Sequence, residues 1–332
     1  MFRNPLTIGV DIGHHSIKAV VLRQKKSGLE LVAFAEVVLP APVLNKQHSV
    51  NAPALLSAMR KLKKALPYGA RQAVLALPDS AVISKVVQLD SHLTEDESLF
   101  AVEQAISASS PFPVEELRLD FSPMTRETFG EQSQTHPVQV YATRKETVDS
   151  RVAVMRQARL EPTVMELQTH VLVWLEQYLA EQQGIEGDWG IVDIGHTITA
   201  IGIKAPAGTV YRREVSFGGE AMEQIDNTFS GSGDSTARAE QFTKLLADNL
   251  KRQIQLYRTT YPRSALEGVW LSGDGQNLIL EEMLARMLSL SVRKIHPLSG
   301  FQRSAKLDID WEEEVYGQYA VAAGLAIRGA SA

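Results

Sequence analysis

One short sequence that occurs twice constrains the fold of this chain more than any other feature. The pentapeptide VDIGH at residues 10–14 returns at residues 192–196. In each copy an apolar run leads into the pentapeptide and a β-branched run follows it. A third alternating run then begins after a turn that holds Gly28 or Gly208. Each copy therefore predicts three strands joined by turns, and the duplication predicts two related domains that face each other.

The segment between the two copies has a different pattern. Residues of about 84–160 read as strand, helix, strand, strand and helix, and the first of these helices begins with a capping box at residues 94–97. This order predicts a β-α-β-β-α insertion with a small domain of its own. After the second copy, residues 236–258 predict a long helix. The apolar stretch at residues 315–327 is too short for a membrane anchor, and it predicts a buried helix.

The composition excludes several classes of protein. With 44 % hydrophobic and 22 % charged residues and a net charge of −5, the 332-residue chain is typical of a globular protein. It lacks the basic surface of a protein that binds nucleic acid directly, and we expect the pair Arg212-Arg213 to be solvated. The absence of cysteine excludes disulfides and thiolate metal sites. No signal peptide or membrane-spanning run is evident, so we expect a cytoplasmic protein without direct membrane insertion.

The two VDIGH turns have the chemistry of a phosphate clamp. Gly13 and Gly195 allow sharp turns whose amide groups can approach phosphate oxygens closely. The hydroxyl groups of Ser16 and Thr197 would add hydrogen-bond donors, and Lys18 would place a cation at the β-phosphate. A single turn of this kind is usually no more than a connection between strands. Its recurrence in two matching contexts favours a shared function.

Two further groups of residues complete this interpretation. Asp11 and Asp193, one from each copy, would hold Mg²⁺ through its water ligands, because hard cations prefer oxygen. Gly273-Asp274-Gly275 follows a predicted strand and precedes a helix, where it would lie near the base or the α-phosphate of a nucleotide.

Competing motifs are missing from the sequence. There is no P-loop, and the dinucleotide-binding fingerprint fails because Leu278 stands where its third glycine would be. His14, His15 and His196 lie in the two turns, but their spacing is not that of zinc ligands.

At this point the residues resemble the actin-like ATPases. Residues 9–20 resemble the first phosphate motif of that superfamily, residues 191–197 with Gly218 and Gly219 resemble the second, and residues 271–275 resemble the adenosine motif. The insertion is more specific, because residues 110–121 and 144–149 are similar to PilM. PilM is the cytoplasmic actin-like protein of type IV pilus machines, and its relatives include competence proteins linked to DNA uptake. The similarity covers essentially the whole chain.

The resemblance implies an α/β, actin-like, ribonuclease H-like duplicated fold with two lobes around a cleft for ATP and Mg²⁺. It adds His14, His15, His196, Gly218 and Gly219 to the nucleotide site. Lys244 is added through a looser likeness to the helix beside the adenine. Gln168, on the strand that returns from the insertion, stands where relatives carry a residue that orients water. Glutamine cannot act as a general base, so we expect at most a weak ATPase.

The resemblance also implies a partner and a domain organisation. The partner is a bitopic inner-membrane protein similar to PilN, whose cytoplasmic tail would bind in an apolar groove beside the insertion and recruit the chain to the inner membrane. The expected regions are a first lobe of residues 1–83, 161–190 and about 305–332, an insertion of residues 84–160, and a second lobe of residues 191–304 with a reduced outer part.

Two other functions fit the same fold. One is a filament-forming, FtsA-like cytoskeletal ATPase, and some self-association is compatible with the sequence. The other is a phosphotransferase of the sugar-kinase branch, for which no aspartate stands in the expected strand-to-helix context.

Overall fold

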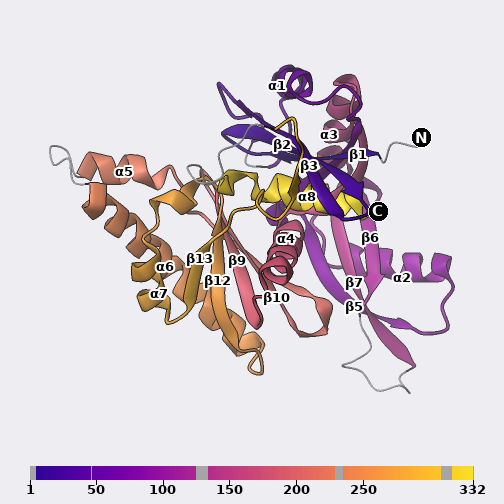
Figure 1. Cartoon of the computed structure of the whole chain (residues 1–332). Helices are drawn as coiled ribbons and strands as arrows, with labels where there is room; N and C mark the ends of the chain where they lie inside the picture. The colour runs from indigo at the N-terminus through magenta and orange to yellow at the C-terminus, as the bar shows by residue number, and fades with distance from the viewer. Residues whose placement is uncertain (1–4, 46, 125–133, 229–234, 308–315, 332) are drawn as a thin grey trace.

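The computed structural model describes residues 5–45, 47–124, 134–228, 235–307 and 316–331. It contains three β-sheets with helices on their faces (Figure 1). The six-stranded sheet has the strand order β14-β3-β2-β1-β4-β8, the five-stranded sheet has the order β11-β10-β9-β12-β13, and the three-stranded sheet has the order β5-β7-β6.

The six-stranded sheet and its helices form the first lobe, and the three-stranded sheet is an insertion between its strands β4 and β8. The first lobe comprises β1 (Leu6–Ile12), β2 (Ser16–Lys25), β3 (Gly28–Val38), α1 (Ala52–Ala65), β4 (Gln72–Leu77), α3 (Lys145–Gln157), β8 (Glu161–Leu167), α4 (Gln168–Gln183), β14 (Gln302–Arg303) and α8 (Ala320–Ala330). The insertion comprises β5 (Ile83–Asp90), α2 (Glu95–Ser107), β6 (Leu117–Pro123) and β7 (Thr135–Arg144).

The five-stranded sheet and three helices form the second lobe. Its elements are β9 (Asp188–Ile194), β10 (Thr199–Lys204), β11 (Val210–Val215), α5 (Ala221–Thr228), α6 (Ser235–Thr260), β12 (Leu266–Ser272), α7 (Glu281–Leu288) and β13 (Ser291–Lys294).

The two large sheets share one topology. In the first, β1 pairs antiparallel with β2, β2 pairs antiparallel with β3, and the parallel strands β4 and β8 follow on the other side of β1. In the second, β9, β10, β11, β12 and β13 take the same places with the same directions. The sequence repeat therefore marks a structural duplication, and the predicted strands around both VDIGH turns are confirmed.

The central layer of the molecule consists of α4 and α8, which lie between the two large sheets (Figure 1). Helix α8 packs on β1, β2 and β4 of the first sheet, whereas α4 packs on β9, β10 and β11 of the second. The two helices also contact each other, and Gly324 of α8 lies directly against the Val171 carbonyl of α4. Residues 320–327 are all buried, so the prediction of a buried C-terminal helix is confirmed. No helix in the described part of the chain is long and apolar enough to cross a membrane.

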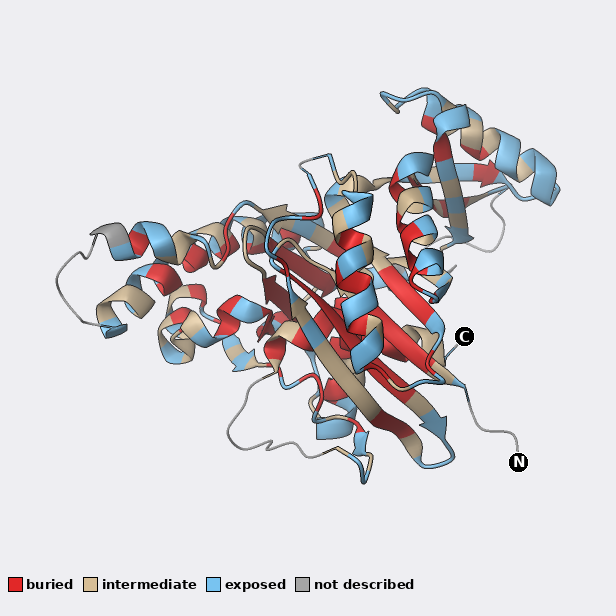
Figure 2. Ribbon diagram, turned by 90° about the horizontal axis from the view of Figure 1, so that it is seen from above, coloured by how far each residue is buried: buried red, intermediate tan, exposed pale blue. Residues whose placement is uncertain are grey.

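The outer faces of the sheets are covered by amphipathic helices, whose exposed sides Figure 2 shows in blue. Asn51 caps helix α1, because its side chain accepts a hydrogen bond from the Ala54 amide. The helix buries Leu55, Met59 and Leu62 against the first sheet. Helices α5, α6 and α7 cover the second sheet. Helix α2 begins with the predicted capping box of Thr94 and Glu97.

The helix expected to close the insertion packs with the first lobe. The helix predicted to close the insertion, α3, contributes Val154 and Met155 to the core of the first lobe and packs against α1. The core of the insertion is built from β5, α2, β6 and β7 instead. The expected boundaries of 84–160 and of the two lobes stay predictions, and the packing of α3 favours an insertion that ends near Arg144.

Candidate functional site

The first VDIGH turn joins β1 to β2. The Gly13 amide donates a hydrogen bond to the Ser16 carbonyl, which closes the turn. Asp11 lies directly opposite Lys18 in the antiparallel pair, so the two side chains share one face of the sheet. The Ser16 hydroxyl is buried and has no hydrogen-bond partner among the residues that the structure describes.

The second turn, between β9 and β10, repeats this geometry. The Gly195 amide donates to the Ile198 carbonyl, with the same spacing as in the first turn. Asp193 is 7 % exposed and accepts hydrogen bonds from the Ser272 hydroxyl at 2.7 Å and from the Gln168 side-chain amide at 3.4 Å. Gln168 is the first residue of α4 and does not lie on the strand that returns from the insertion, where the sequence had placed it.

Both turns open onto one cavity of about 110 Å³ between the lobes. Of the residues predicted for the site, those that line this cavity are Asp11, Gly13, His14, His15, Ser16, Lys18, Gln168, Asp193, Gly195, His196, Thr197, Gly273 and Asp274. The structure therefore brings the two aspartates, far apart in the sequence, into one shared space.

Four predicted residues lie outside the cavity lining. Gly218 and Gly219 pack against the backbone of the second turn, and the Gly219 amide donates a hydrogen bond to the Gly195 carbonyl. Gly275 is buried against the Ile194 side chain. Lys244 is exposed on α6, so the geometry gives no support to its predicted role beside the adenine.

Contacts across the cavity hold the two lobes together. The Lys18 ammonium lies 3.4 Å from a carboxylate oxygen of Asp274, in the second lobe, and 3.7 Å from Glu36. The rings of His15 and His196 lie 5.1 Å apart, one from each turn. The lysine predicted to meet the β-phosphate is therefore paired with Asp274, which the sequence placed near the base or the α-phosphate.

Burial and neighbouring charges shift the pKa of Asp11, Asp193 and His14 in this cavity. Burial raises the pKa of Asp11 to about 7, although Lys18 lowers it, and the Asp193 and Asp274 carboxylates raise it further. Burial also raises the pKa of Asp193, which the hydrogen bond from Ser272 opposes. The pKa of His14 is lowered, first by burial and then by His196. Two buried carboxyls at such close quarters favour a bound cation.

The donor set fits a Mg²⁺–polyphosphate group. Among the described residues, the amides of His14, His15, His196 and Thr197 donate no hydrogen bond, and the Ser16 hydroxyl is also unpaired. The available volume is below the ~300–1,000 Å³ of small-molecule sites. A nucleotide would need more space than the cleft offers in this structure.

The sequence interpretation missed several residues around the cavity. His48, Glu214 and Gln318 also line it, although no motif contains them. The prediction that Arg212 is solvated is wrong. Its side chain is 13 % exposed, and its guanidinium lies 2.7 Å from a carboxylate oxygen of Asp79. Alternation along β11 was the available signal, since it separates Arg212 from Arg213 onto opposite faces.

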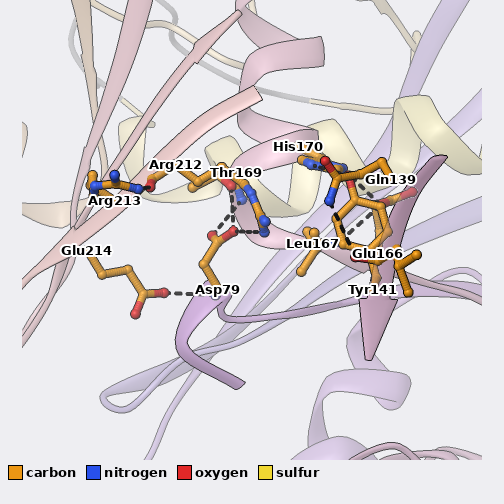
Figure 3. Close-up of polar contacts among 11 residues, drawn as sticks. Asp79, Gln139, Tyr141, Glu166, Leu167, Thr169, His170, Arg212, Arg213 and Glu214 are labelled. Carbon is orange, nitrogen blue, oxygen red and sulfur yellow. Dashed lines mark hydrogen bonds and ion pairs between the residues drawn. The ribbon is translucent and has the colours of Figure 1, made fainter. Parts of the chain in front are cut away.

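Asp79 is the centre of a polar network that joins the second lobe to the root of the insertion (Figure 3). Its carboxylate accepts hydrogen bonds from the Thr169 hydroxyl and from Arg212, and its amide donates to Glu214 at 2.8 Å. The Arg212 guanidinium also lies over the ring of Tyr141, on β7 of the insertion. Arg212 and Glu214, which lie two residues apart on β11, therefore attach this strand to Asp79, in the segment from which the insertion emerges.

A second cavity, of about 290 Å³, lies between the insertion and β8. Its apolar lining includes Leu77, Val82, Leu119, Ala142, Val148, Met165 and Leu167. Asp120 and Glu166 add carboxylates to this lining, and Tyr141 connects it to the Asp79 network. Both β6 and β8 are outermost strands of their sheets.

The family model of type IV pilus assembly protein PilM matches residues 9–330. The chain belongs to the PilM family. A solved structure described as a PilM-PilN type IV pilus biogenesis complex has a TM-score of 0.80 and 24 % identity, and the match covers 98 % of each chain.

Two other solved structures resemble the chain more distantly. Ethanolamine utilization protein EutJ from Carboxydothermus hydrogenoformans has a TM-score of 0.52 and 14 % identity, over 98 % of this chain and 90 % of that one. A diol dehydratase-reactivating factor in nucleotide-free form has a TM-score of 0.52 and 8 % identity, over 99 % and 100 %. The predicted actin-like α/β fold with two lobes is confirmed.

Proposed function

We propose that this chain is a cytoplasmic adaptor of a type IV pilus-like assembly that holds the tail of a PilN-like inner-membrane protein beside its insertion. Membership of the PilM family supports this role over a filament or a sugar kinase. The membrane partner would recruit the chain to the inner membrane. Service in DNA uptake, as in the competence relatives, stays a prediction.

The cavity between the insertion and β8 carries the proposal. An extended peptide that binds beside an outermost strand gains backbone hydrogen bonds, and its alternate side chains enter apolar pockets. Leu119 and Met165 supply such a surface from two different sheets. Cytoplasmic segments next to membrane spans are rich in lysine and arginine, which the carboxylate of Asp120 would attract.

The cleft between the lobes would hold Mg-ATP. Asp11 and Asp193 would bind the metal through its waters, and Lys18 and the free turn amides would bind the phosphates. Gln168, hydrogen-bonded to Asp193, would orient a water molecule without accepting its proton, which supports weak hydrolysis at most.

Calorimetry with a synthetic peptide of the partner's cytoplasmic tail tests the proposal. Leu119→Asp should weaken binding by at least about tenfold, because it places a charge in an apolar pocket. Leu99→Asp is the matched control, since Leu99 is 41 % exposed on α2 of the same insertion and should change affinity less than twofold. Failure of the wild-type chain to bind the tail, or equal losses in both variants, would contradict the proposal.

A neighbouring cavity of about 450 Å³ borders the insertion at Phe112 and Arg144. Phe112→Asp distinguishes the two sites, because the same peptide should bind this variant as tightly as the wild type. If Phe112→Asp lost binding and Leu119→Asp did not, the tail would bind in the neighbouring cavity instead.

A further inference from the structure

A larger cavity, of about 640 Å³, lies near the other end of α4, away from the cleft between the lobes. Gln168, the first residue of α4, lines the cleft between the lobes. The residues of α4 that line the 640 Å³ cavity are Glu176, Gln177, Ala180 and Glu181. Eight residues of helix separate Gln168 from Glu176, which is about 12 Å. The start of β9 and the end of β10 complete the walls, so the two lobes share this cavity as well.

Glu176 is the unusual group in this cavity. Its side chain is buried, with 5 % of the residue exposed. No hydrogen bond or ion pair engages its carboxyl group within the described ranges of the chain. Burial raises its pKa to about 7, and the charge of Lys204 only partly offsets this rise. An unpaired carboxyl in such surroundings costs free energy unless a cation or a proton joins it.

The other lining residues suit an organic cation with an apolar stem. Glu181 and Asp188 add two carboxylates, and Lys204 is the cation among the described lining residues, while the Arg293 guanidinium lies over the Trp189 ring, 5.5 Å from its centre. Asp188 is already partnered, since one of its oxygens accepts a hydrogen bond from the Ser264 hydroxyl. Ile185, Trp189, Ala205 and Pro206 supply apolar surface. The carbonyl groups at the end of α4 add negative potential on this side of the helix.

We propose that this cavity binds a primary alkylammonium group, with the ammonium at Glu176 and the alkyl stem along Ile185 and Trp189. Its volume lies within the range of small-molecule sites, so it accommodates a free amine or the side chain of a lysine presented by another protein. The site does not depend on the nucleotide or on the tail-binding cavity, because none of its lining residues belongs to either of them.

The test follows the methyl resonance of Ile185 by NMR while n-pentylamine is added at pH 8. A saturable shift is expected, and 1-pentanol, which has the same stem without the charge, should produce none. The peptide acetyl-Gly-Lys-Gly-amide in a parallel titration distinguishes the sources. A shift with both probes assigns the site to lysine side chains as well as free amines, and a shift with pentylamine alone assigns it to free amines.

Glu176→Gln should weaken pentylamine binding by at least about tenfold, because a charge-assisted hydrogen bond is lost. Glu186→Gln is the matched control, since Glu186 is exposed on the adjacent loop and outside the lining. Binding should also weaken about tenfold from pH 8 to pH 6, as Glu176 takes up a proton. The other charged side chains of the described lining are Glu181, Asp188 and Lys204.

No saturable shift in the wild type, or equal affinities in Glu176→Gln and the wild type, would overturn the proposal. Thermal unfolding checks that both variants are folded. Glu176→Gln keeps the shape of the side chain and removes a buried charge, so it should unfold at or above the wild-type temperature at pH 8.

Discussion

The two VDIGH hairpins share a backbone and differ in what surrounds their aspartates. In the first hairpin Asp11 lies opposite Lys18, whereas in the second the matching position opposite Asp193 is Ala200. Asp193 receives its hydrogen bonds from outside the hairpin, from Ser272 on β12 and Gln168 on α4. The two matching turns therefore present carboxyl groups with different partners. Asp11 faces the charge of Lys18, whereas Asp193 accepts hydrogen bonds from neutral donors.

The two copies therefore share a backbone geometry and differ in the side chains that contact the aspartate. The strand pairing and the glycine turn are common to both copies, because they depend on the local backbone. The cation is present in one copy alone, yet Lys18 serves both lobes by contacting Asp274 across the cleft. Two lysines at matching positions would repel each other over one narrow cavity.

The largest effect is expected from removing that cation. Lys18→Met should lower the free energy of unfolding by about 2–3 kcal/mol at pH 8, because Asp11 and Asp274 lose their partner. The loss should be smaller at pH 5.5. Asp11 has a pKa of about 7 in the folded wild type, so it is protonated there and gains little from Lys18. Urea unfolding at the two pH values measures both numbers, and a loss that does not depend on pH would contradict this account.

The next effect concerns the nucleotide. Mg-ATP at a hundredfold excess over its Kd should stabilise the wild-type chain by about 2.7 kcal/mol, and Asp11→Asn should abolish that gain. Thermal unfolding with and without Mg-ATP measures it. Asp120→Asn, on the exposed face of the insertion, is the control and should respond as the wild type does. If millimolar Mg-ATP does not raise the wild-type unfolding temperature, the cleft holds no nucleotide.

A smaller effect is expected in the second hairpin, where Asp193 is contacted by neutral hydrogen-bond donors and not by a cation. Ser272→Ala should cost about 1.5–2 kcal/mol, because its buried hydroxyl donates to one oxygen of Asp193. Urea unfolding at pH 8 measures the change. A cost below about 0.5 kcal/mol would mean that Gln168 alone is sufficient to satisfy Asp193.

The smallest effect on the free protein is expected at Ser16. Its hydroxyl is buried without a partner, so Ser16→Ala should change the free energy of unfolding by less than about 0.5 kcal/mol or raise it. The same variant should nevertheless reduce stabilisation by Mg-ATP by about 1 kcal/mol, since a donor to phosphate is lost. An effect on unfolding as large as that of Ser272→Ala would remove the distinction between the two hydroxyls.

The hairpins were visible in the sequence because their causes are local. Glycine at a fixed spacing, β-branched runs and the capping box at Thr94 each depend on a few neighbouring residues. The buried C-terminal helix was equally clear from its composition.

Long-range pairing was not visible. Asp79 and Arg212 are separated by 133 residues, and nothing in either neighbourhood indicates the other. The apolar face of α3 predicts that the helix is buried but not which sheet covers it, so its packing on the first lobe required the structure. Lys244 was placed by a loose pattern on one helix, which fixes neither the direction of a side chain nor its distance from a cleft.

The crossed positions of α4 and α8 have a consequence for how the chain can be divided. Helix α4 follows β8 of the first sheet yet packs on the second, and α8 comes after β13 of the second sheet and the short strand β14 yet packs on the first. The last helix of each half of the chain, α4 or α8, thus packs on the sheet of the other half. This arrangement resembles a domain-swapped dimer whose two subunits are joined in one polypeptide. Either half expressed separately would leave an apolar sheet face bare, so the halves should regain a folded form only when both are mixed.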